Sequence, residues 1–240
     1  MDKLPNFKQN KTEKPLAILI ILSGLTGIFL CLINAQYDGY SHWTKRLLYF
    51  TNQSNIWVII IYFLSILPFA KKHKESVFFC KYIFTVCITL TALMFCCFLG
   101  PFADKSYHAW SISGILTHAI TPALVLCDFA IQKQRFLINK KAIFYTLIPP
   151  IIYLILTSIL FFINLDFGRG ENFPYFFMNY FSPAKLVGFS SVLPYFMGAF
   201  YWLILILFLI LFLGFFFQKL NNNLCGKFSL KKDKSTTKNR

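Results

Sequence analysis

Hydrogen-bonding side chains crowd together near residue 50, at the start of a segment that is otherwise apolar. They include Thr51, Asn52, Ser54 and Asn55. On a helix, Thr51 and Asn55 share one face because four residues separate them. A threonine hydroxyl attacks an ester once a base has removed its proton, and a nearby amide can donate a hydrogen bond to the developing oxyanion. We therefore predict Thr51 as a nucleophile, with Asn52, Asn55 and Ser54 supporting the substrate or the oxyanion.

A histidine in a second apolar segment could supply the base. His118 and Thr121 are three residues apart and share a helical face, so Thr121 is a further candidate for substrate support. Pro122 leaves the carbonyl of His118 without its helical hydrogen bond. A neutral imidazole in a mostly apolar pocket can accept a proton near pH 7, which makes Thr51 and His118 chemically sufficient for acyl transfer and hydrolysis. Alternatively, the same polar side chains only hydrogen-bond one helix to another.

Both clusters lie in segments that are long and apolar enough to cross a lipid bilayer. With 57% apolar and 14% charged residues, the composition does not fit a soluble surface. A bilayer core needs about 20 apolar residues per helix. Six segments meet this requirement: residues 15–36, 47–69, 77–100, 110–131, 142–163 and 191–217. The predicted fold is an all-α integral membrane bundle of six transmembrane helices (15–217), between a basic N-terminal segment (1–14) and a basic, disordered tail (218–240).

The positive charges are distributed unevenly between the two ends of these helices. Of the 24 Lys and Arg residues, 19 fall on the side that holds both termini and 5 on the other side. The positive-inside rule then predicts cytoplasmic termini in a plasma membrane. The lysine runs at residues 71–74 and 227–234 would attract anionic lipid headgroups, so the net charge of +15 does not require a nucleic-acid partner. In this topology the Thr51 and His118 clusters both lie in the outer half of the membrane, where they can meet.

Other residues predict no metal and no cofactor. Seven cysteines lie mostly inside the helices and form no C-x-x-C pair, which argues against a disulfide framework or a zinc site. Asp128, close to Lys133 and Arg135, is interpreted as an interfacial charge or as a proton or ion site. The outer segment 164–188 is crowded with Phe and Tyr, and is either an aromatic belt at the interface or a lid over a lipid-facing cleft.

Three stretches resemble the bacterial six-helix relatives of the androgen-induced-gene family, which includes androgen-dependent tissue-factor-pathway-inhibitor-regulating protein. They are residues 49–55, residues 118–122 together with Asp128, and residues 173–177. The resemblance extends from the first helix to the sixth. Eukaryotic members of the family are threonine hydrolases of fatty-acid esters of hydroxy fatty acids. The resemblance implies Thr51 as nucleophile and His118 as general base, although the residues after Thr51 differ from the eukaryotic motif.

The expected function is therefore that of a membrane-embedded threonine hydrolase, whose amphiphilic fatty-acyl ester substrate enters from the outer leaflet. A first alternative is a small-molecule or ion transporter that coordinates its solute near Pro122. Transporters of this kind usually show repeats and broken helices in both halves, and here only the fourth segment looks broken. A second alternative is a non-catalytic membrane scaffold that binds partners through its basic loops. The sequence makes no prediction of the oligomeric state.

Overall fold

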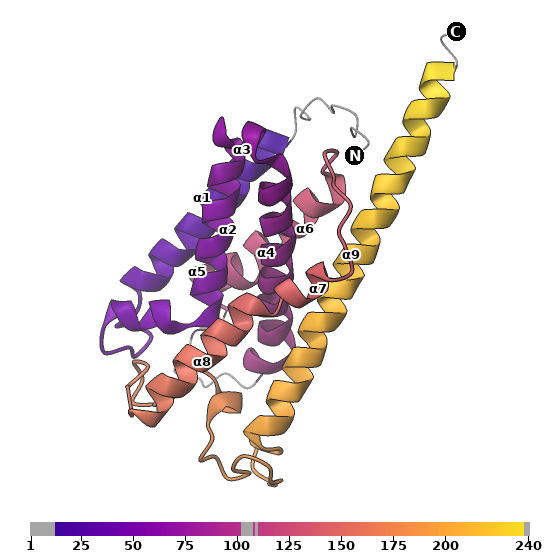
Figure 1. Cartoon of the computed structure of the whole chain (residues 1–240). Helices are drawn as coiled ribbons and strands as arrows, with labels where there is room; N and C mark the ends of the chain where they lie inside the picture. The colour runs from indigo at the N-terminus through magenta and orange to yellow at the C-terminus, as the bar shows by residue number, and fades with distance from the viewer. Residues whose placement is uncertain (1–12, 102–107, 109, 238–240) are drawn as a thin grey trace.

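The computed structural model describes residues 13–101, 108 and 110–237, and every regular element in this part of the chain is a helix (Figure 1). The helices are α1 (Glu13–Ile33), α2 (Phe50–Ile66), α3 (Phe69–Lys72), α4 (Lys74–Met94), α5 (Ile112–Ile115), α6 (Thr121–Ile131), α7 (Ala142–Tyr145), α8 (Ile148–Phe162) and α9 (Ala199–Thr237). Short 3-10 turns cover Trp43–Leu48 and Phe176–Met178. The prediction of an all-helical chain is confirmed for the described residues.

Within the described residues, five helical segments are long and apolar enough to cross a membrane. They are Glu13–Ile33, Lys74–Leu99, Ile112–Ile131, Ala142–Phe162 and Ala199–Gly226. The remaining predicted span corresponds to α2, which has 17 residues and lies at the lower limit of about 17 for a transmembrane helix. Large apolar side chains on α8 and α9 point outward, among them Ile152, Ile155 and Phe208. These exposed faces suit contact with lipid.

Two predicted spans are interrupted by π-helical turns. One turn covers Phe95–Leu99 at the end of α4, and the other covers Leu116–Ile120 between α5 and α6. In the second, the N–H of Thr121 bonds the carbonyl of Leu116, five residues earlier. Pro122 has no N–H to offer the carbonyl of His118, which removes one ordinary helical bond at this level. Single π turns of this kind occur frequently at functional sites.

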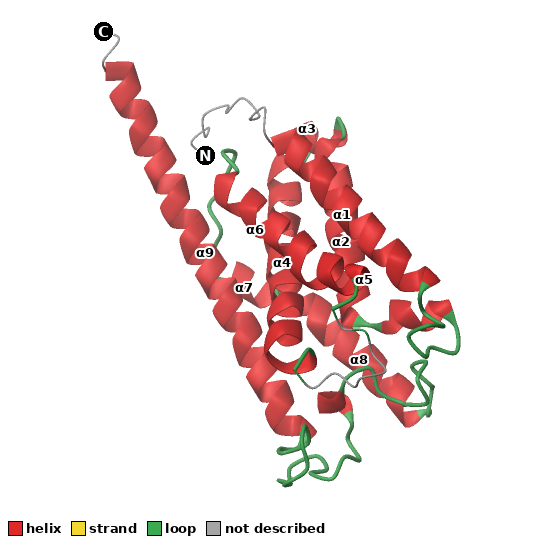
Figure 2. Ribbon diagram, turned by 180° about the vertical axis from the view of Figure 1, so that it is seen from behind, coloured by secondary structure: helices red, strands yellow, loops and turns green. Residues whose placement is uncertain are grey.

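The last helix differs most from the sequence prediction. It begins at Ala199 rather than at residue 191, because residues 190–197 form a tight turn closed by a bridge between Phe189 and Met197. It then continues to Thr237, so no break in the helix marks the expected boundary at residue 217. Seen from behind, α9 runs along one side of the bundle and its C-terminal part extends beyond the other helices (Figure 2).

The bundle has two apolar cores. One contains buried side chains of α1, α2, α4 and α6, including Ile20, Val58 and Ile88. The other lies between α4, α8 and α9 and includes Tyr82 and Trp202. In this arrangement α2 packs between α1 and α4, and α6 packs against both α1 and α4. The π turn Leu116–Ile120, which carries His118, contacts α1 and α2, so it lies next to the helix that carries Thr51.

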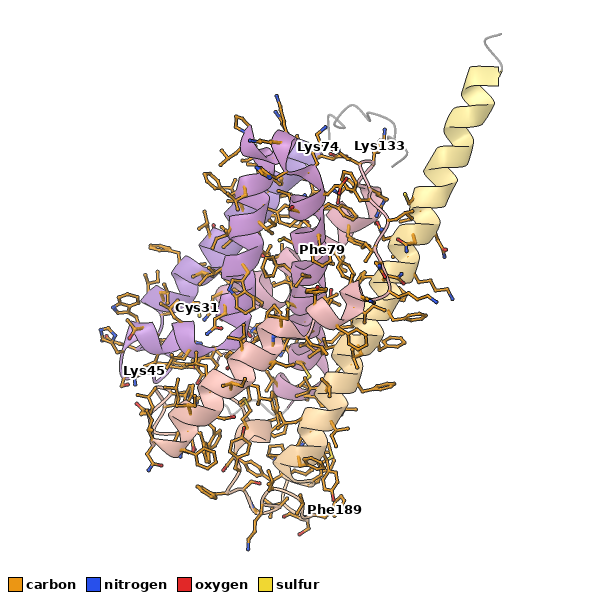
Figure 3. All side chains as sticks on the ribbon, in the orientation of Figure 1. Cys31, Lys45, Lys74, Phe79, Lys133 and Phe189 are labelled. Carbon is orange, nitrogen blue, oxygen red and sulfur yellow. The ribbon has the colours of Figure 1, made fainter. Side chains whose placement is uncertain are left out.

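Two connecting segments meet at one end of the bundle, the end toward which Lys45 and Phe189 lie in Figure 3. The α1–α2 connection bonds the segment after α8, with Ser41 N–H donating to the Gly168 carbonyl at 2.8 Å. Lys45 Nζ also donates to the Asp166 carbonyl at 2.5 Å. Gly168 has φ +116°, and a Cβ there would approach Tyr40 to 2.5 Å, so only glycine fits. These contacts fix the aromatic segment over the end of α2.

Candidate functional site

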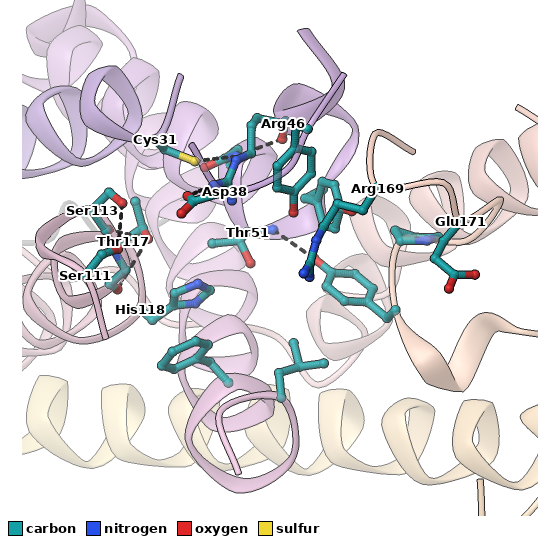
Figure 4. Close-up of a pocket in the computed structure, with 18 of the residues that line it drawn as sticks. Cys31, Asp38, Arg46, Thr51, Ser111, Ser113, Thr117, His118, Arg169 and Glu171 are labelled. Carbon is teal, nitrogen blue, oxygen red and sulfur yellow. Dashed lines mark hydrogen bonds and ion pairs between the residues drawn. The ribbon is translucent and has the colours of Figure 1, made fainter. Parts of the chain in front are cut away.

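Thr51 and His118 line the same cavity, whose volume is about 490 Å³. Asn52 lines it beside Thr51, and Tyr175 reaches it from the segment after α8. Figure 4 shows the Thr51 and His118 side chains extending into the same space from different helices. No hydrogen bond joins these two side chains in the structure as described.

Thr51 occupies the first turn of α2, where its backbone N–H has no helical partner of its own. This N–H donates to the Tyr175 hydroxyl at 3.4 Å. The Thr51 carbonyl accepts hydrogen bonds from the Ser54 hydroxyl at 3.0 Å and from the Asn55 amide at 2.8 Å. The backbone around the candidate nucleophile is thus held on both sides, by its own helix and by the aromatic segment.

His118 lies in the π turn and is 5% exposed. Its ring stacks on Phe95, with the ring centroids 3.8 Å apart and an angle of 9° between the planes. Phe95 begins the other π turn, so both irregular turns contribute to the position of the imidazole. Nδ1 of His118 is buried without a hydrogen-bond partner. Stacking, rather than a hydrogen-bonded carboxylate, orients this ring.

Three of the predicted support residues tie helices together and do not line the cavity. The Ser54 hydroxyl lies 2.9 Å from that of Thr91 on α4, and the Thr121 hydroxyl lies 2.8 Å from that of Ser23 on α1. Asn55 donates to the Thr117 carbonyl at 3.1 Å as well as to Thr51. Its amide therefore bridges the elements that carry the nucleophile and the base. These residues hold the helices around the site in place, but their side chains do not line the cavity.

Asn52 does line the cavity, but its amide hydrogens are engaged elsewhere. Its Nδ2 donates to the Arg46 carbonyl at 2.7 Å and to Cys31 Sγ at 3.4 Å. Since an amide nitrogen has two hydrogens, neither is left over for a substrate oxyanion in this arrangement. Asn52 instead connects α2 to the end of α1 and to the α1–α2 connection.

The sequence prediction missed a buried ion pair in the cavity wall. Arg46 pairs with Asp38, and the side chains are 6% and 5% exposed. The Arg46 guanidinium also lies 4.0 Å from the ring centroid of Tyr40, and His108 Nδ1 lies 3.3 Å from Asp38. The signal was present, because the chain has only nine acidic residues and one of them lies eight residues before an arginine between two apolar segments. Arg169, from the segment after α8, also lines the cavity.

The aromatic segment forms one wall of this cavity. Phe173, Pro174, Tyr175 and Phe176 line it. This position corresponds to the lid interpretation, although the same rings can still lie at the membrane interface. Burial raises the pKa of the Tyr175 hydroxyl to about 12, against the opposing effect of its hydrogen bonds with Thr51. Tyr175 therefore keeps its proton at neutral pH and can donate it in a hydrogen bond.

A second, apolar cavity adjoins the first. Its volume is about 110 Å³, and α2, α4, α8 and α9 line it with side chains that include Leu90, Leu154 and Ile206. Thr51, Leu99 and Tyr175 line both cavities. Thr51 therefore stands where a polar space meets an apolar one.

Asp128 is buried in the bundle, and its ion-pair partner is Lys81 rather than Lys133 or Arg135. It is 1% exposed, and its Oδ2 accepts hydrogen bonds from the Tyr62 hydroxyl at 2.8 Å and from Lys81 Nζ at 3.1 Å. Arg135 instead donates to the carbonyls of Phe129 and Ala130 at the end of α6. The predicted interfacial charge is thus a buried ion pair.

Neither a disulfide nor a metal site is found among the described residues. All seven cysteines are free thiols, and no group of three or more His, Cys, Asp or Glu side chains could hold a metal ion within residues 13–101, 108 and 110–237. No protein-family model, curated protein or solved structure matches the chain. The chemical capacity of the site therefore rests on a hydroxyl, an imidazole and a phenol around one cavity, with an apolar space beside them.

Proposed function

We propose that this chain is a membrane-embedded hydrolase that cleaves an amphiphilic fatty-acyl ester, with Thr51 as nucleophile and His118 as general base. The observation that carries the proposal is the position of Thr51 on the wall shared by the 490 Å³ polar cavity and the 110 Å³ apolar cavity. An amphiphilic ester has its carbonyl at such a boundary, because the acyl chain seeks apolar surface and the rest of the molecule does not. His118 lines the same polar cavity.

The proposed reaction has two steps. The Thr51 hydroxyl attacks the ester carbonyl while His118 takes its proton, and the tetrahedral intermediate collapses to an acyl-threonine. The alcohol leaves with the proton that His118 returns. A water molecule then attacks the acyl-threonine as His118 takes a proton from it, which releases the fatty acid and restores the Thr51 hydroxyl. The net reaction consumes one water molecule and yields one acid and one alcohol.

Tyr175 is the proposed donor to the oxyanion. Its hydroxyl lies 3.4 Å from the backbone nitrogen of Thr51 and keeps its proton at neutral pH because its pKa is about 12. A phenol that accepts one hydrogen bond still has its own hydrogen to donate. Donors held in place before the reaction stabilise the charge that develops on the carbonyl oxygen. Asn52 and Asn55, which the sequence suggested for this role, use their amide hydrogens to connect the elements of the site.

The topology and the family resemblance are part of the same proposal. With both termini in the cytoplasm of a plasma-membrane protein, the cavity lies in the outer half of the bilayer and receives its substrate from the outer leaflet. The resemblance to the bacterial relatives of the androgen-induced-gene family assigns the same roles to Thr51 and His118. We propose membership of that family on the three stretches described above.

A turnover assay with matched threonine variants tests the proposal. Purified full-length protein in neutral detergent would be assayed on long-chain and acetyl esters of a fluorogenic alcohol. Thr51→Val keeps the side-chain shape but removes the hydroxyl, and it is expected to lower turnover of the long-chain ester at least about a hundredfold. Thr157→Val is the control, since Thr157 is also buried but bonds the Tyr153 carbonyl on α8 and lines neither cavity. Equal activity in the two variants, or hydrolysis of the acetyl ester alone, would contradict the proposal.

A further inference from the structure

A second polar cavity lies at the opposite end of the bundle, where α1 and α4 begin and where Figure 3 shows Lys74 and Lys133. Its volume is about 90 Å³, enough for several water molecules or one small anion. Lys14, Lys71, Lys74 and Lys81 line it. Glu13 is the only carboxylate among the described residues of this lining. The cavity therefore carries an excess of positive charge.

The lysines fall into two groups with different surroundings. Lys81 lies seven residues after Lys74 on α4, or about 10 Å deeper into the bundle, and its charge is paired with Asp128. Lys14, Lys71 and Lys74 lie near the helix ends, and no ion pair with a carboxylate is found for them in the part of the chain that the structure describes. Cations gathered around one cavity repel one another unless an anion is present between them.

Two uncharged lining residues also favour an anion. Gln132 and Gln134, after α6, contribute two side-chain amides that can donate hydrogen bonds, whereas the Ser65 hydroxyl already donates to the Tyr62 carbonyl at 2.7 Å. Lysine is a common phosphate ligand, and basic pockets between helix ends bind the headgroups of anionic lipids. About one turn deeper than Lys14, Ile18 and Leu19 are 48% and 50% exposed on α1. A phosphate at the cavity would thus have apolar surface below it for a lipid chain.

We propose that this cavity is a binding site for a phosphate group, carried by an anionic phospholipid whose acyl chains lie against the exposed face of α1. The rim lysines Lys71 and Lys74 contact the phosphate, and Lys81, fixed by Asp128, forms the floor. The site is separate from the Thr51 cavity and does not depend on hydrolysis. A soluble phosphate compound would present the same chemistry, and the experiment distinguishes the two sources.

The test measures the thermal unfolding midpoint of the full-length protein in neutral detergent. Phosphatidylglycerol, phosphatidylcholine or inorganic phosphate would be added to the wild type, to K71Q/K74Q and to the control K140Q/K141Q. Lys140 and Lys141 are exposed in the α6–α7 connection and lie outside the cavity. A ligand that binds the folded state raises the midpoint. Phosphatidylglycerol is expected to raise it in the wild type and in the control, and by less than half as much in K71Q/K74Q.

Each other outcome has a definite meaning. A rise with inorganic phosphate that is lost in K71Q/K74Q supports the site and assigns it to a soluble phosphate. Equal rises with phosphatidylglycerol and phosphatidylcholine, or equal rises in K71Q/K74Q and K140Q/K141Q, would overturn the proposal. If K71Q/K74Q does not purify as folded protein, Lys14→Gln provides the same comparison, because Lys14 is an exposed residue on the cavity rim.

Discussion

Two buried ion pairs lie toward opposite ends of the bundle, and their surroundings differ. Asp38 and Arg46 adjoin a 490 Å³ cavity that also contains Thr51 and His118. Asp128 pairs with a lysine that lines a 90 Å³ cavity whose other charged groups are mostly lysines. Each pair has a hydroxyl nearby, but of the two cavities only the first is also lined by an imidazole. A buried charge in a membrane bundle therefore marks a polar site, and its neighbours decide which chemistry the site can perform.

The largest expected effect comes from breaking each pair in turn. Asp38→Asn and Asp128→Asn each leave a cation without its carboxylate, which costs about 3–5 kcal/mol in folding free energy. Chemical denaturation in detergent would measure both losses. Hydrolytic activity per folded molecule should fall only in Asp38→Asn, because Asp38 lines the cavity and Asp128 does not. An equal fall in both variants would show that the two ends do not act separately.

Removing the imidazole should affect turnover and leave the fold intact. His118→Gln is expected to lower kcat about 10²–10⁴-fold, the range for loss of a general base. Its unfolding midpoint should fall only modestly, because the variant loses the stacking contact with Phe95 but Nδ1 has no hydrogen bond to lose. His42→Gln is the control, since His42 is exposed and its ring nitrogen bonds the nearby Thr44. A large loss of stability with unchanged turnover in His118→Gln would instead indicate a packing role.

A smaller effect is expected for the phenol in the aromatic wall. Tyr175→Phe keeps the ring but removes the proposed oxyanion donor, and should lower kcat about 10²–10³-fold with KM nearly unchanged. Tyr180→Phe provides a matched control on the same segment, because the Tyr180 hydroxyl bonds Ser158 and lines neither cavity. If KM rises in Tyr175→Phe while kcat is retained, the phenol binds substrate rather than the transition state.

The smallest effect concerns the loop contact that holds the aromatic segment. Partial burial raises the pKa of Asp166. Hydrogen bonds from Gly168 N–H, the Ser41 hydroxyl and Gly170 N–H lower this pKa by more than burial raises it, so the folded-state pKa lies below its ordinary value. Its contribution to stability is therefore present above the unfolded-state pKa of about 4 and is lost as the pH falls through the folded-state pKa. Asp166→Asn should lower the midpoint by about 2 °C at neutral pH. The difference from the wild type should vanish in acid, and a constant difference would exclude this cause.

The meeting of Thr51 and His118 could be predicted because it is a consequence of topology. Each residue lies in an apolar segment, and one further apolar segment separates the two along the chain, so consecutive spans of alternating direction would give both the same direction. The direction of each side chain was harder to predict. A regular helix would place His118 and Thr121 on one face, but the π turn Leu116–Ile120 contains an extra residue and rotates the next part of the helix by about 100°. Thr121 consequently faces Ser23 on α1, away from the cavity.

Tyr175 and the Asp38–Arg46 pair could not be assigned from sequence periodicity, because they lie in connecting segments that have none. Their positions depend on contacts between distant parts of the chain, such as Ser41 with Gly168.

The long continuation of α9 was missed for a different reason. Helix propensity without apolar periodicity is a weak signal, and the lysine-rich composition after residue 217 favoured the prediction of a disordered tail.

Locating the nucleophile by covalent labelling would decide whether the Thr51 cavity is an active site. Purified full-length protein would be treated with a long-chain fluorophosphonate, digested and analysed by tandem mass spectrometry. Phosphonylation is expected on the Thr51 hydroxyl in the wild type and in Thr157→Val, and on no residue in Thr51→Val. Labelling of another residue at undiminished yield in Thr51→Val would contradict the assignment of Thr51 as the nucleophile.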